Sequence, residues 1–199
     1  IHRVMTLTHR IESPDGINPL AKYLNLGNHD EAELKISKFV NDAIDSMEKQ
    51  RFKEALRSIM NISQFGNGLI QHSEPWKYIN SEESTEKNES LSTLAFCWQV
   101  CKGLAVTLRP FLPFQSDRLW NMLGEKSEID NLLYEDAFNF TSDIHWNSSK
   151  PMPLFARLDI ENILEREKSI AGQDEEKIEL KEQEVKYIDF EDFMKVEMK

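Results

Sequence analysis

The chain has 199 residues, of which 40% are hydrophobic and 10% aromatic, and it contains only seven Gly and seven Pro. This composition excludes collagen-like and low-complexity proteins, and the length is sufficient to bury a substantial core. The net charge is −11, but residues 158–199 hold seven basic and fourteen acidic side chains, so the rest of the chain can still present a local basic surface.

The first two predicted helices lie in the N-terminal quarter. Residues 1–11 follow an apolar helical pattern that opens without a cap, which indicates a helix that starts earlier and therefore a fragment of a longer protein. The segment 12–19, with two prolines and a glycine, ends this helix. Asn28 or Asp30 can cap a second helix, whose apolar residues up to Met47 recur at i, i+3, i+4 and i+7.

Two longer helices are predicted next. The third runs from about Phe52 to His72, and the polar, acidic stretch 79–90 after it is predicted to be an exposed loop. Ser90 can cap a fourth helix with a strongly apolar pattern up to residue 108. Prolines at positions 110 and 113 then stop it.

The C-terminal part changes character several times. A short fifth helix is predicted over residues 114–124, with Gly124 as its C-terminal cap, and residues 129–138 add a turn or two. Residues 150–159 are predicted to form an extended strap on the helices. From about residue 159 to 184 the charged pattern predicts a solvated helix or linker, and the aromatic end of the chain predicts the beginning of a strand.

The long apolar-striped segments with short connections predict an all-α fold, an antiparallel helical bundle. In such a bundle the first and third helices point the same way, so their C-terminal ends lie at the same end of the molecule. His9 and Arg10 are therefore expected to face the loop that carries Trp76.

Neither a disulfide nor a metal site is predicted. Cys97 and Cys101 are four residues apart and share one helical face, where a disulfide is geometrically disfavoured. A metal site made of thiolates needs three or four ligands, and the chain has no further cysteine. There is no leader-like segment and no run of about eighteen uninterrupted apolar residues, so we expect a reduced, cytoplasmic protein without a membrane span.

Four stretches carry a resemblance to a known family. They are "HRVMTLTHR", "ALRSIMNISQFGNGLIQHSEPWK", "LAVTLRPFLPFQSDRLWNMLG" and "KPMPLFARLD". In this order they resemble the anticodon-binding helical domain of methionyl-tRNA synthetases of the archaeal and eukaryotic type. The resemblance implies three parts: an anticodon-binding bundle at 1–158, a charged linker helix at 159–186, and at 187–199 the truncated start of an appended tRNA-binding OB-fold module.

The resemblance also implies where the chemistry of the parent enzyme lies. Such enzymes join methionine to initiator and elongator methionine tRNA in the cytoplasm, with ATP and Mg²⁺ in the catalytic part and a structural zinc there. This chain has no sequence like "HIGH" or "KMSKS" and no CxxC pair. We therefore expect no catalytic residue, cofactor or metal in this fragment, and in the full-length protein the appended module can mediate oligomerisation.

The expected task of the fragment is to recognise the CAU anticodon of the tRNA. Proteins read unpaired bases by stacking them on aromatic side chains and by hydrogen-bonding their edges. The resemblance assigns stacking to Trp76, a contact with the triplet to Arg10, and the place of a polar partner to Asn67. His9, His72 and Lys77 are expected to add phosphate or base contacts, on the ground of proximity alone.

Two further expectations concern the neighbours of Trp76 and Arg10. Pro75 restricts its own φ and biases Glu74 towards extended conformations, which preorganises Trp76. No role is assigned to Thr6, where many bacterial members have Asn.

Other interpretations stay open. Trp76 can instead cap the third helix and pack on the end of the bundle, and Arg10 can form a surface ion pair with Glu12 or Glu74. Trp98 and Trp120 are predicted core residues, and Trp146 is predicted to hold the strap. At the level of function, the alternatives are an acidic helical scaffold that binds a protein through Trp76, or the anticodon domain of a leucine, valine, isoleucine or cysteine enzyme.

Overall fold

The computed structural model describes residues 1–13, 17–138, 140, 144–147, 149–155 and 159–170. The elements in chain order are α1 (His2–Thr8), η1 (Ala21–Tyr23), α2 (Asp30–Glu48), α3 (Phe52–Ser73), η2 (Pro75–Lys77), α4 (Thr85–Leu108), α5 (Pro113–Met122) and η3 (Ile129–Asn131). The described residues contain no strand, so the all-α prediction is confirmed. The chain divides into two units, Ile1–Phe155 and Ala156–Lys199.

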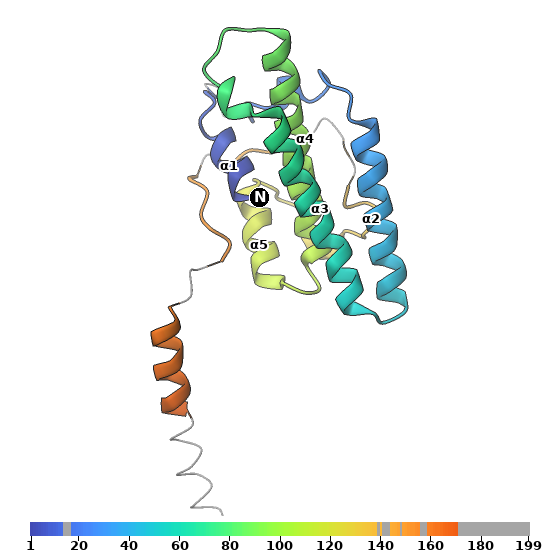
Figure 1. Cartoon of the computed structure of the whole chain (residues 1–199), viewed down its shortest axis with the longest axis vertical. Helices are drawn as coiled ribbons and strands as arrows, with labels where there is room; N and C mark the ends of the chain where they lie inside the picture. The colour runs from blue at the N-terminus through green and yellow to red at the C-terminus, as the bar shows by residue number, and fades with distance from the viewer. Residues whose placement is uncertain (14–16, 139, 141–143, 148, 156–158, 171–199) are drawn as a thin grey trace, which may run out of the picture. The chain divides into compact units, whose positions relative to one another are not determined.

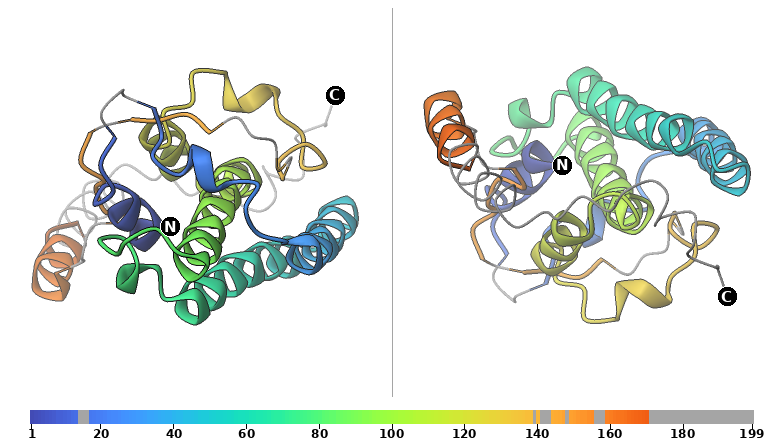
Figure 2. Two further views of the ribbon diagram at one scale, coloured as in Figure 1. Left: turned by 90° about the horizontal axis from the view of Figure 1, so that it is seen from above. Right: turned by 90° about the horizontal axis from the view of Figure 1, so that it is seen from below.

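Unit 1 is an antiparallel bundle. α2 and α3 form a hairpin, α4 runs against α3, and α5 turns back along α4 (Figure 1). Seen from above and below, α4 lies between the α2–α3 hairpin on one side and α1 and α5 on the other (Figure 2). The C-terminal ends of α1 and α3 lie at the same end, as the parity of an antiparallel bundle predicts (Figure 1).

The central helix α4 is buried on almost every face. From Ser90 to Thr107 its residues are buried except Thr93 and Lys102. Among the described residues it is also the helix with the length and apolar character of a membrane span, but 83% of its most apolar window is buried inside the structure. Its hydrophobicity therefore matches its place at the centre of the bundle.

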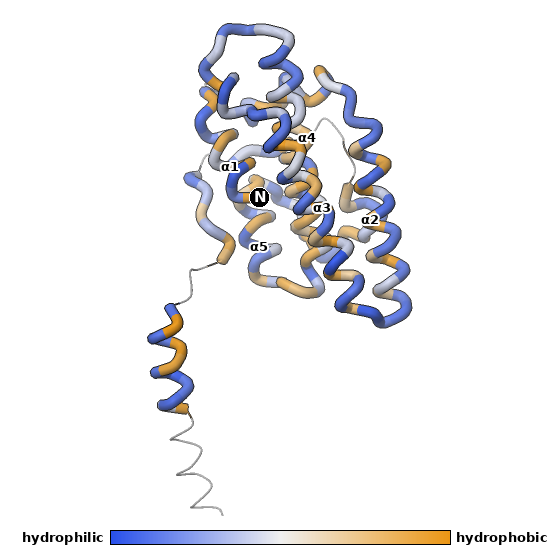
Figure 3. Tube along the Cα trace, in the orientation of Figure 1, coloured by the Kyte–Doolittle hydropathy of each residue, from blue (hydrophilic) through white to orange (hydrophobic). Residues whose placement is uncertain are grey.

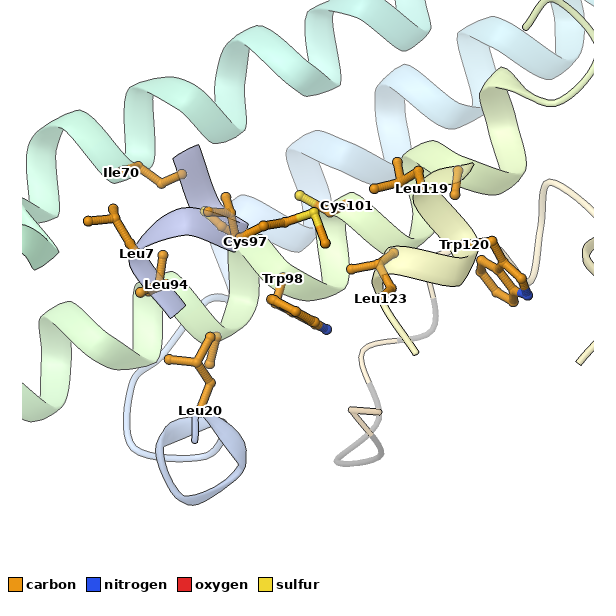
Figure 4. Close-up of a cluster of buried hydrophobic side chains, with 14 of the residues drawn as sticks. Leu7, Leu20, Ile70, Leu94, Cys97, Trp98, Cys101, Leu119, Trp120 and Leu123 are labelled. Atoms are coloured by element: carbon orange, nitrogen blue, oxygen red, sulfur yellow. The ribbon is translucent and has the colours of Figure 1, made fainter. Parts of the chain in front are cut away.

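Two hydrophobic clusters flank α4. The first joins α1, α4, α5 and the η1 region, and it buries the residues drawn in Figure 4, among them Trp98, Leu20 and Leu123. The second lies between α2, α3 and α4. Each fully buried large side chain of this kind stabilises the fold by about 1.5–3 kcal/mol. The predicted core positions of Trp98 and Trp120 are confirmed, at 1% and 4% exposure.

The hairpin helices have the amphipathic pattern of surface helices. Along α2 and α3 hydrophilic and hydrophobic residues alternate (Figure 3), and the apolar ones face the second cluster. α2 begins at Asp30, but its N-cap is His29 and no side chain caps it, so the predicted cap at Asn28 or Asp30 was wrong. The Asn28 side chain instead accepts a hydrogen bond from the Asp30 N–H at 2.9 Å in the turn before the helix. The predicted span of the third helix, 52–72, agrees with α3 to within one residue.

The predicted start of the fourth helix was wrong. α4 begins at Thr85, and its N-cap is Ser84, whose side chain accepts a hydrogen bond from the Lys87 N–H. Only the first part of the predicted loop 79–90 is therefore outside a helix. Ser90 lies inside α4, where its hydroxyl donates to the Ser73 carbonyl at 2.6 Å. The polar residues 85–90 suggested a loop. They are helical because they form the first turns of α4, continuous with its buried part, and because Ser84 caps them.

The end of unit 1 agrees with the predicted turn at Gly124, whereas residues 156–158 of the predicted strap lie outside the described residues and the hold of Trp146 on the strap stays a prediction. α5 ends at Met122 with Leu123 as its C-cap, and Gly124, the next residue, has φ +81°, the left-handed conformation typical of a helix C-terminus. Trp146 is half-buried and packs on the first cluster, with its ring 5.9 Å from that of Trp98. Residues 150–155 form no helix, and the Leu154 carbonyl accepts a hydrogen bond from Arg118.

Unit 2 is described for residues 159–170 only. Residues 160–170 form a helix in which every side chain is exposed, as predicted for a solvated segment. The rest of the predicted linker, 171–186, and the predicted strand at 187–199 lie outside the described residues. The division of the chain at 158 and 186 stays a prediction.

Candidate nucleic-acid interface

One face of α1 and the segment after α3 enclose a hollow at the surface of unit 1. Its lining residues are His2, Arg3, Thr6, Leu7, Arg10 and Trp76, and its volume is about 460 Å³. Positions 3, 6 and 7 have helical spacing and share the face of α1 that is turned towards Trp76, and Arg10, in the turn after α1, continues this face. This Trp76 hollow brings together the two side chains, Trp76 and Arg10, to which the resemblance assigns the principal contacts.

The backbone before Trp76 is held by the end of α3. Glu74 adopts a left-handed conformation, φ 45° and ψ 49°, and its N–H donates to the Ile70 carbonyl at 3.1 Å. The prediction of an extended Glu74 was therefore wrong. The left-handed conformation closes the last turn of α3 and costs about 1–2 kcal/mol for a residue with a Cβ.

Pro75 then begins the short helix η2 that carries Trp76. Pro75 is buried, and its carbonyl accepts hydrogen bonds from the N–H groups of Tyr78 and Ile79 at 3.1 and 3.2 Å. The Lys77 N–H donates to the Glu74 carbonyl at 2.9 Å. Because a fixed proline φ and three hydrogen bonds define this turn, the backbone at Trp76 has little freedom.

The indole of Trp76 is half-buried. It packs against the first hydrophobic cluster and also lines the hollow, so it contributes to the packing at the end of the bundle and is accessible from the surface. The guanidinium carbon of Arg3 lies 4.4 Å from the centroid of the Trp76 ring. Arg3 also donates from Nη1 to Oε1 of Gln71 at 3.0 Å. Sequence reasoning missed Arg3; its spacing of seven residues from Arg10, two turns along the same face, was the available signal.

Arg10 follows the C-terminal end of α1. Its N–H donates to the Leu7 carbonyl at 3.1 Å, and its side chain is exposed and lines the Trp76 hollow. Within the part of the chain that the structure describes, the ion pair of Glu74 is with Lys77, and no ion pair of Arg10 is found. The guanidinium of Arg10 is thus available to an incoming group.

The other predicted site residues lie elsewhere. His9 is half-buried: Nδ1 is 2.8 Å from the Met5 carbonyl oxygen, Nε2 is 3.1 Å from that of Asn147, and its ring lies 4.4 Å from the ring of Trp146. These contacts tie the end of α1 to the segment 144–147, and His9 is not among the residues that line the Trp76 hollow.

Lys77, Asn67 and His72 are exposed. Lys77 donates to Glu74, and this hydrogen bond raises the pKa of the Lys77 ammonium. Asn67 lines a neighbouring hollow of about 350 Å³, which shares Arg3 with the Trp76 hollow. The structure therefore brings Trp76 and Arg10 together, and it places Asn67 in an adjoining hollow linked to them through Arg3.

The Trp76 hollow suits a flat aromatic ligand that carries negative charge. It offers one indole and two guanidinium groups that stay charged at any physiological pH, and no carboxylate lines it. Thr6, whose Oγ1 is 3.5 Å from Nδ1 of His2, adds a hydroxyl. Such a set matches the stacking and phosphate contacts by which proteins bind unpaired nucleotides.

Neither a metal site nor a reactive cysteine is found among the described residues. These residues include no cluster of three or more His, Cys, Asp or Glu side chains that could hold a metal ion. Cys97 and Cys101 are buried and free, and burial raises the pKa of both thiols. Both therefore remain protonated and behave as core residues.

Comparison with known proteins points to one family. Residues 31–187 match the family described as "Anticodon-binding domain of tRNA ligase". The chain is 31% identical over 180 residues to the methionine–tRNA ligase of Methanopyrus kandleri, an alignment that covers 87% of this chain and 25% of that protein. It is 32% identical over 124 residues to the methionine–tRNA ligase of Pyrococcus furiosus, with 62% of this chain and 16% of that protein covered.

A third relative agrees. The methionine–tRNA ligase of Methanosarcina mazei is 30% identical over 161 residues, which are 77% of this chain and 22% of that protein. The chain thus spans a quarter or less of the length of these curated relatives.

Proposed function

The chain belongs to the anticodon-binding domains of tRNA ligases, and from this we propose that it recognises the CAU anticodon loop of methionine tRNA through the Trp76 hollow. The observation that carries the proposal is the convergence of Trp76 and Arg10 on one hollow. The choice of methionine is supported by the relatives, which are named methionine–tRNA ligases, and by the order of the four sequence stretches.

In the proposed complex an unstacked anticodon base enters the hollow and lies against the part of the Trp76 indole that the cluster and the Arg3 guanidinium leave open. A base stacked on an aromatic side chain contributes about 1–3 kcal/mol, as judged by alanine substitution. The fixed turn at Pro75 reduces the conformational entropy that Trp76 loses when the base arrives. Arg10, at the other end of the α1 face, donates hydrogen bonds to a base edge or to a phosphate of the same loop.

The chemistry of the whole protein is proposed to lie in other parts of it. A longer ligase of this kind attaches methionine to initiator and elongator tRNA in the cytoplasm with ATP and Mg²⁺, and its catalytic part holds the structural zinc. In this proposal the present domain contributes recognition only, and an appended OB-fold module brings about any oligomerisation. Asn67 is proposed to add a contact from the adjoining hollow, and His9 and Lys77 are proposed to add contacts as the chain neighbours of Arg10 and Trp76.

The test is binding of stem-loop RNA to the purified chain. A labelled stem-loop with a CAU triplet is compared with one whose triplet is scrambled, by fluorescence anisotropy. We expect tighter binding of the CAU loop, and Trp76→Ala and Arg10→Ala should each weaken it by about 1 kcal/mol or more, which is about fivefold. Arg57→Ala, which removes an exposed arginine of α3 outside the hollow, is the matched control.

Several outcomes contradict the proposal. Equal affinity for both stem-loops indicates general attraction to RNA, and preference for a leucine, valine, isoleucine or cysteine anticodon indicates another ligase. If Trp76→Ala leaves the affinity for RNA unchanged but abolishes binding of a protein partner, the scaffold alternative is favoured. The salt dependence of binding should be small, because each phosphate neutralised on single-stranded RNA adds only about −0.7 to the slope and the hollow offers two guanidinium groups.

A further inference from the structure

Arg3 connects three elements around Trp76. It comes from the first turn of α1, its guanidinium covers the ring of Trp76 with 4.4 Å between guanidinium carbon and ring centroid, and its Nη1 donates to Gln71 at 3.0 Å. Gln71 belongs to the last turn of α3, just before the segment that carries Trp76. Arg3 also lines both neighbouring hollows.

Arg3 is exposed, so burial does not hold it in this position. Its location is set by two simultaneous contacts, a hydrogen bond from one nitrogen and a cation–π contact of the guanidinium with the Trp76 ring. A guanidinium can make both because it is planar and carries five N–H donors in a fixed arrangement. Gln71, an exposed side chain, is held in turn by the same hydrogen bond.

We propose that Arg3 is a positioning residue for Trp76: anchored by Gln71, it holds the indole in the orientation that receives the anticodon base. This inference rests on the proposed function and deepens it. The η2 turn restrains the backbone of Trp76 but leaves its side-chain torsions to be set by neighbours. A ring already held in place loses less side-chain entropy on binding, and this gain reaches the RNA affinity through Trp76.

A geometric role of Arg3 and a purely electrostatic role predict different effects of substituting it. If Arg3 only attracts phosphate, Arg3→Lys keeps the affinity for the CAU stem-loop, and Arg3→Met lowers this affinity by the contribution of one positive charge. If Arg3 positions the indole, lysine is an incomplete substitute, because an ammonium is a compact charge on a flexible stem and cannot hold Gln71 and cover the ring together. The order of affinity should then be wild type, Arg3→Lys, Arg3→Met, with about three- to tenfold loss in Arg3→Met.

The matched charge control is Arg57→Met. Arg57 is an exposed arginine of α3, and it lies 16 positions before Ser73 in that helix. At 1.5 Å per residue, about 24 Å of helix separate it from the end that carries Gln71. The Arg57→Met variant therefore removes one positive charge from the chain, as Arg3→Met does, without changing a contact of Trp76.

The first experiment needs no RNA. The chain is labelled with 5-fluorotryptophan, and the fluorine resonance of Trp76 is identified as the one lost in Trp76→Phe. We expect Arg3→Met and Gln71→Leu to shift and broaden this resonance, while those of the buried Trp98 and Trp120 stay in place. A general loss of structure moves all of them, and an unchanged Trp76 resonance overturns the inference.

The second experiment is a double-mutant cycle with the CAU stem-loop. If Arg3 acts through Trp76, Arg3→Met weakens binding in the wild-type background but, in Trp76→Ala, weakens it no more than Arg57→Met does. Equal effects of Arg3→Met in both backgrounds overturn the inference.

The two proposals fail in different ways. Suppose that Trp76→Ala weakens binding and Arg3→Met merely matches Arg57→Met: the proposed function then stands and the inference is wrong. If Trp76→Ala leaves the affinity unchanged, both fail.

Discussion

Two glycines inside helices offer a sharp test of the packing around α4. Gly68 lies in α3, and a Cβ added there meets no atom within 4 Å. Gly103 lies in α4, where an added Cβ meets three ring carbons of Phe138 at 2.3, 2.4 and 2.7 Å. The same substitution, Gly→Ala, therefore tests helix propensity alone at position 68 and propensity against a steric clash at position 103.

The expected free energies of unfolding differ in size between the two variants. In a helix interior Ala is favoured over Gly by about 0.8–1.0 kcal/mol, so Gly68→Ala should stabilise the protein by this amount. The same gain applies to Gly103→Ala, but there the ring of Phe138 must move by about 1 Å or more, and such overpacking costs about 1–3 kcal/mol. The propensity terms cancel in the difference, so Gly103→Ala should be about 1–3 kcal/mol less stable than Gly68→Ala.

The measurement is urea unfolding followed by far-ultraviolet circular dichroism for the two variants and the wild type. Phe138→Leu and the double variant Gly103→Ala with Phe138→Leu complete the set, because the smaller leucine should relieve the clash and recover most of the loss. If Gly103→Ala is as stable as Gly68→Ala, the ring of Phe138 does not lie on α4 over Gly103, and the described packing of this turn is wrong.

Three further predictions concern helix caps, backbone conformation and pH. Ser84→Ala should cost about 1 kcal/mol in urea unfolding because the Lys87 N–H loses its acceptor, and an unchanged stability would show that α4 does not begin there. Gly124→Ala should cost more than about 2 kcal/mol, since the residue has φ +81° and an added Cβ would lie 2.6 Å from the Trp146 carbonyl carbon; a smaller loss in the thermal midpoint would contradict this approach. Burial lowers the pKa of His29 below its ordinary 6.5, so the unfolded chain binds a proton that the folded chain resists, and stability should fall as pH drops through 6.5. Unfolding measured between about pH 7.5 and 5.5 should show a flatter profile in His29→Gln, and equal slopes would argue against it.

Local signals in the sequence were sufficient for most helix boundaries. Pro113 opens α5 and Gly124 follows its end in the left-handed conformation, as the properties of these two residues require. The start of α4 was missed because residues 85–89 are polar. Their helical state depends on Ser84 and on the buried helix that follows, and Ser90, the predicted cap, instead bonds to Ser73.

For the candidate site, the sequence supplied the participants but not all of their contacts. The resemblance named Trp76 and Arg10, and the parity of an antiparallel bundle placed them at one end. Neither source indicated that Glu74 closes α3 in a left-handed conformation, or that the His9 ring packs on Trp146 and hydrogen-bonds to the Asn147 carbonyl. Whether each side chain contributes to RNA binding stays a prediction until the variants are measured.

The order of apolar and polar residues, with its prolines and glycines, determines by itself that the chain is helical and roughly where each helix lies, because backbone preferences and periodicity act over a few neighbouring residues. Only the tertiary structure decides that Arg3 lies on the ring of Trp76 and bonds to Gln71, 68 positions along the chain. Contacts between residues so far apart depend on how α1 and α3 pack around α4, and no local pattern records that packing.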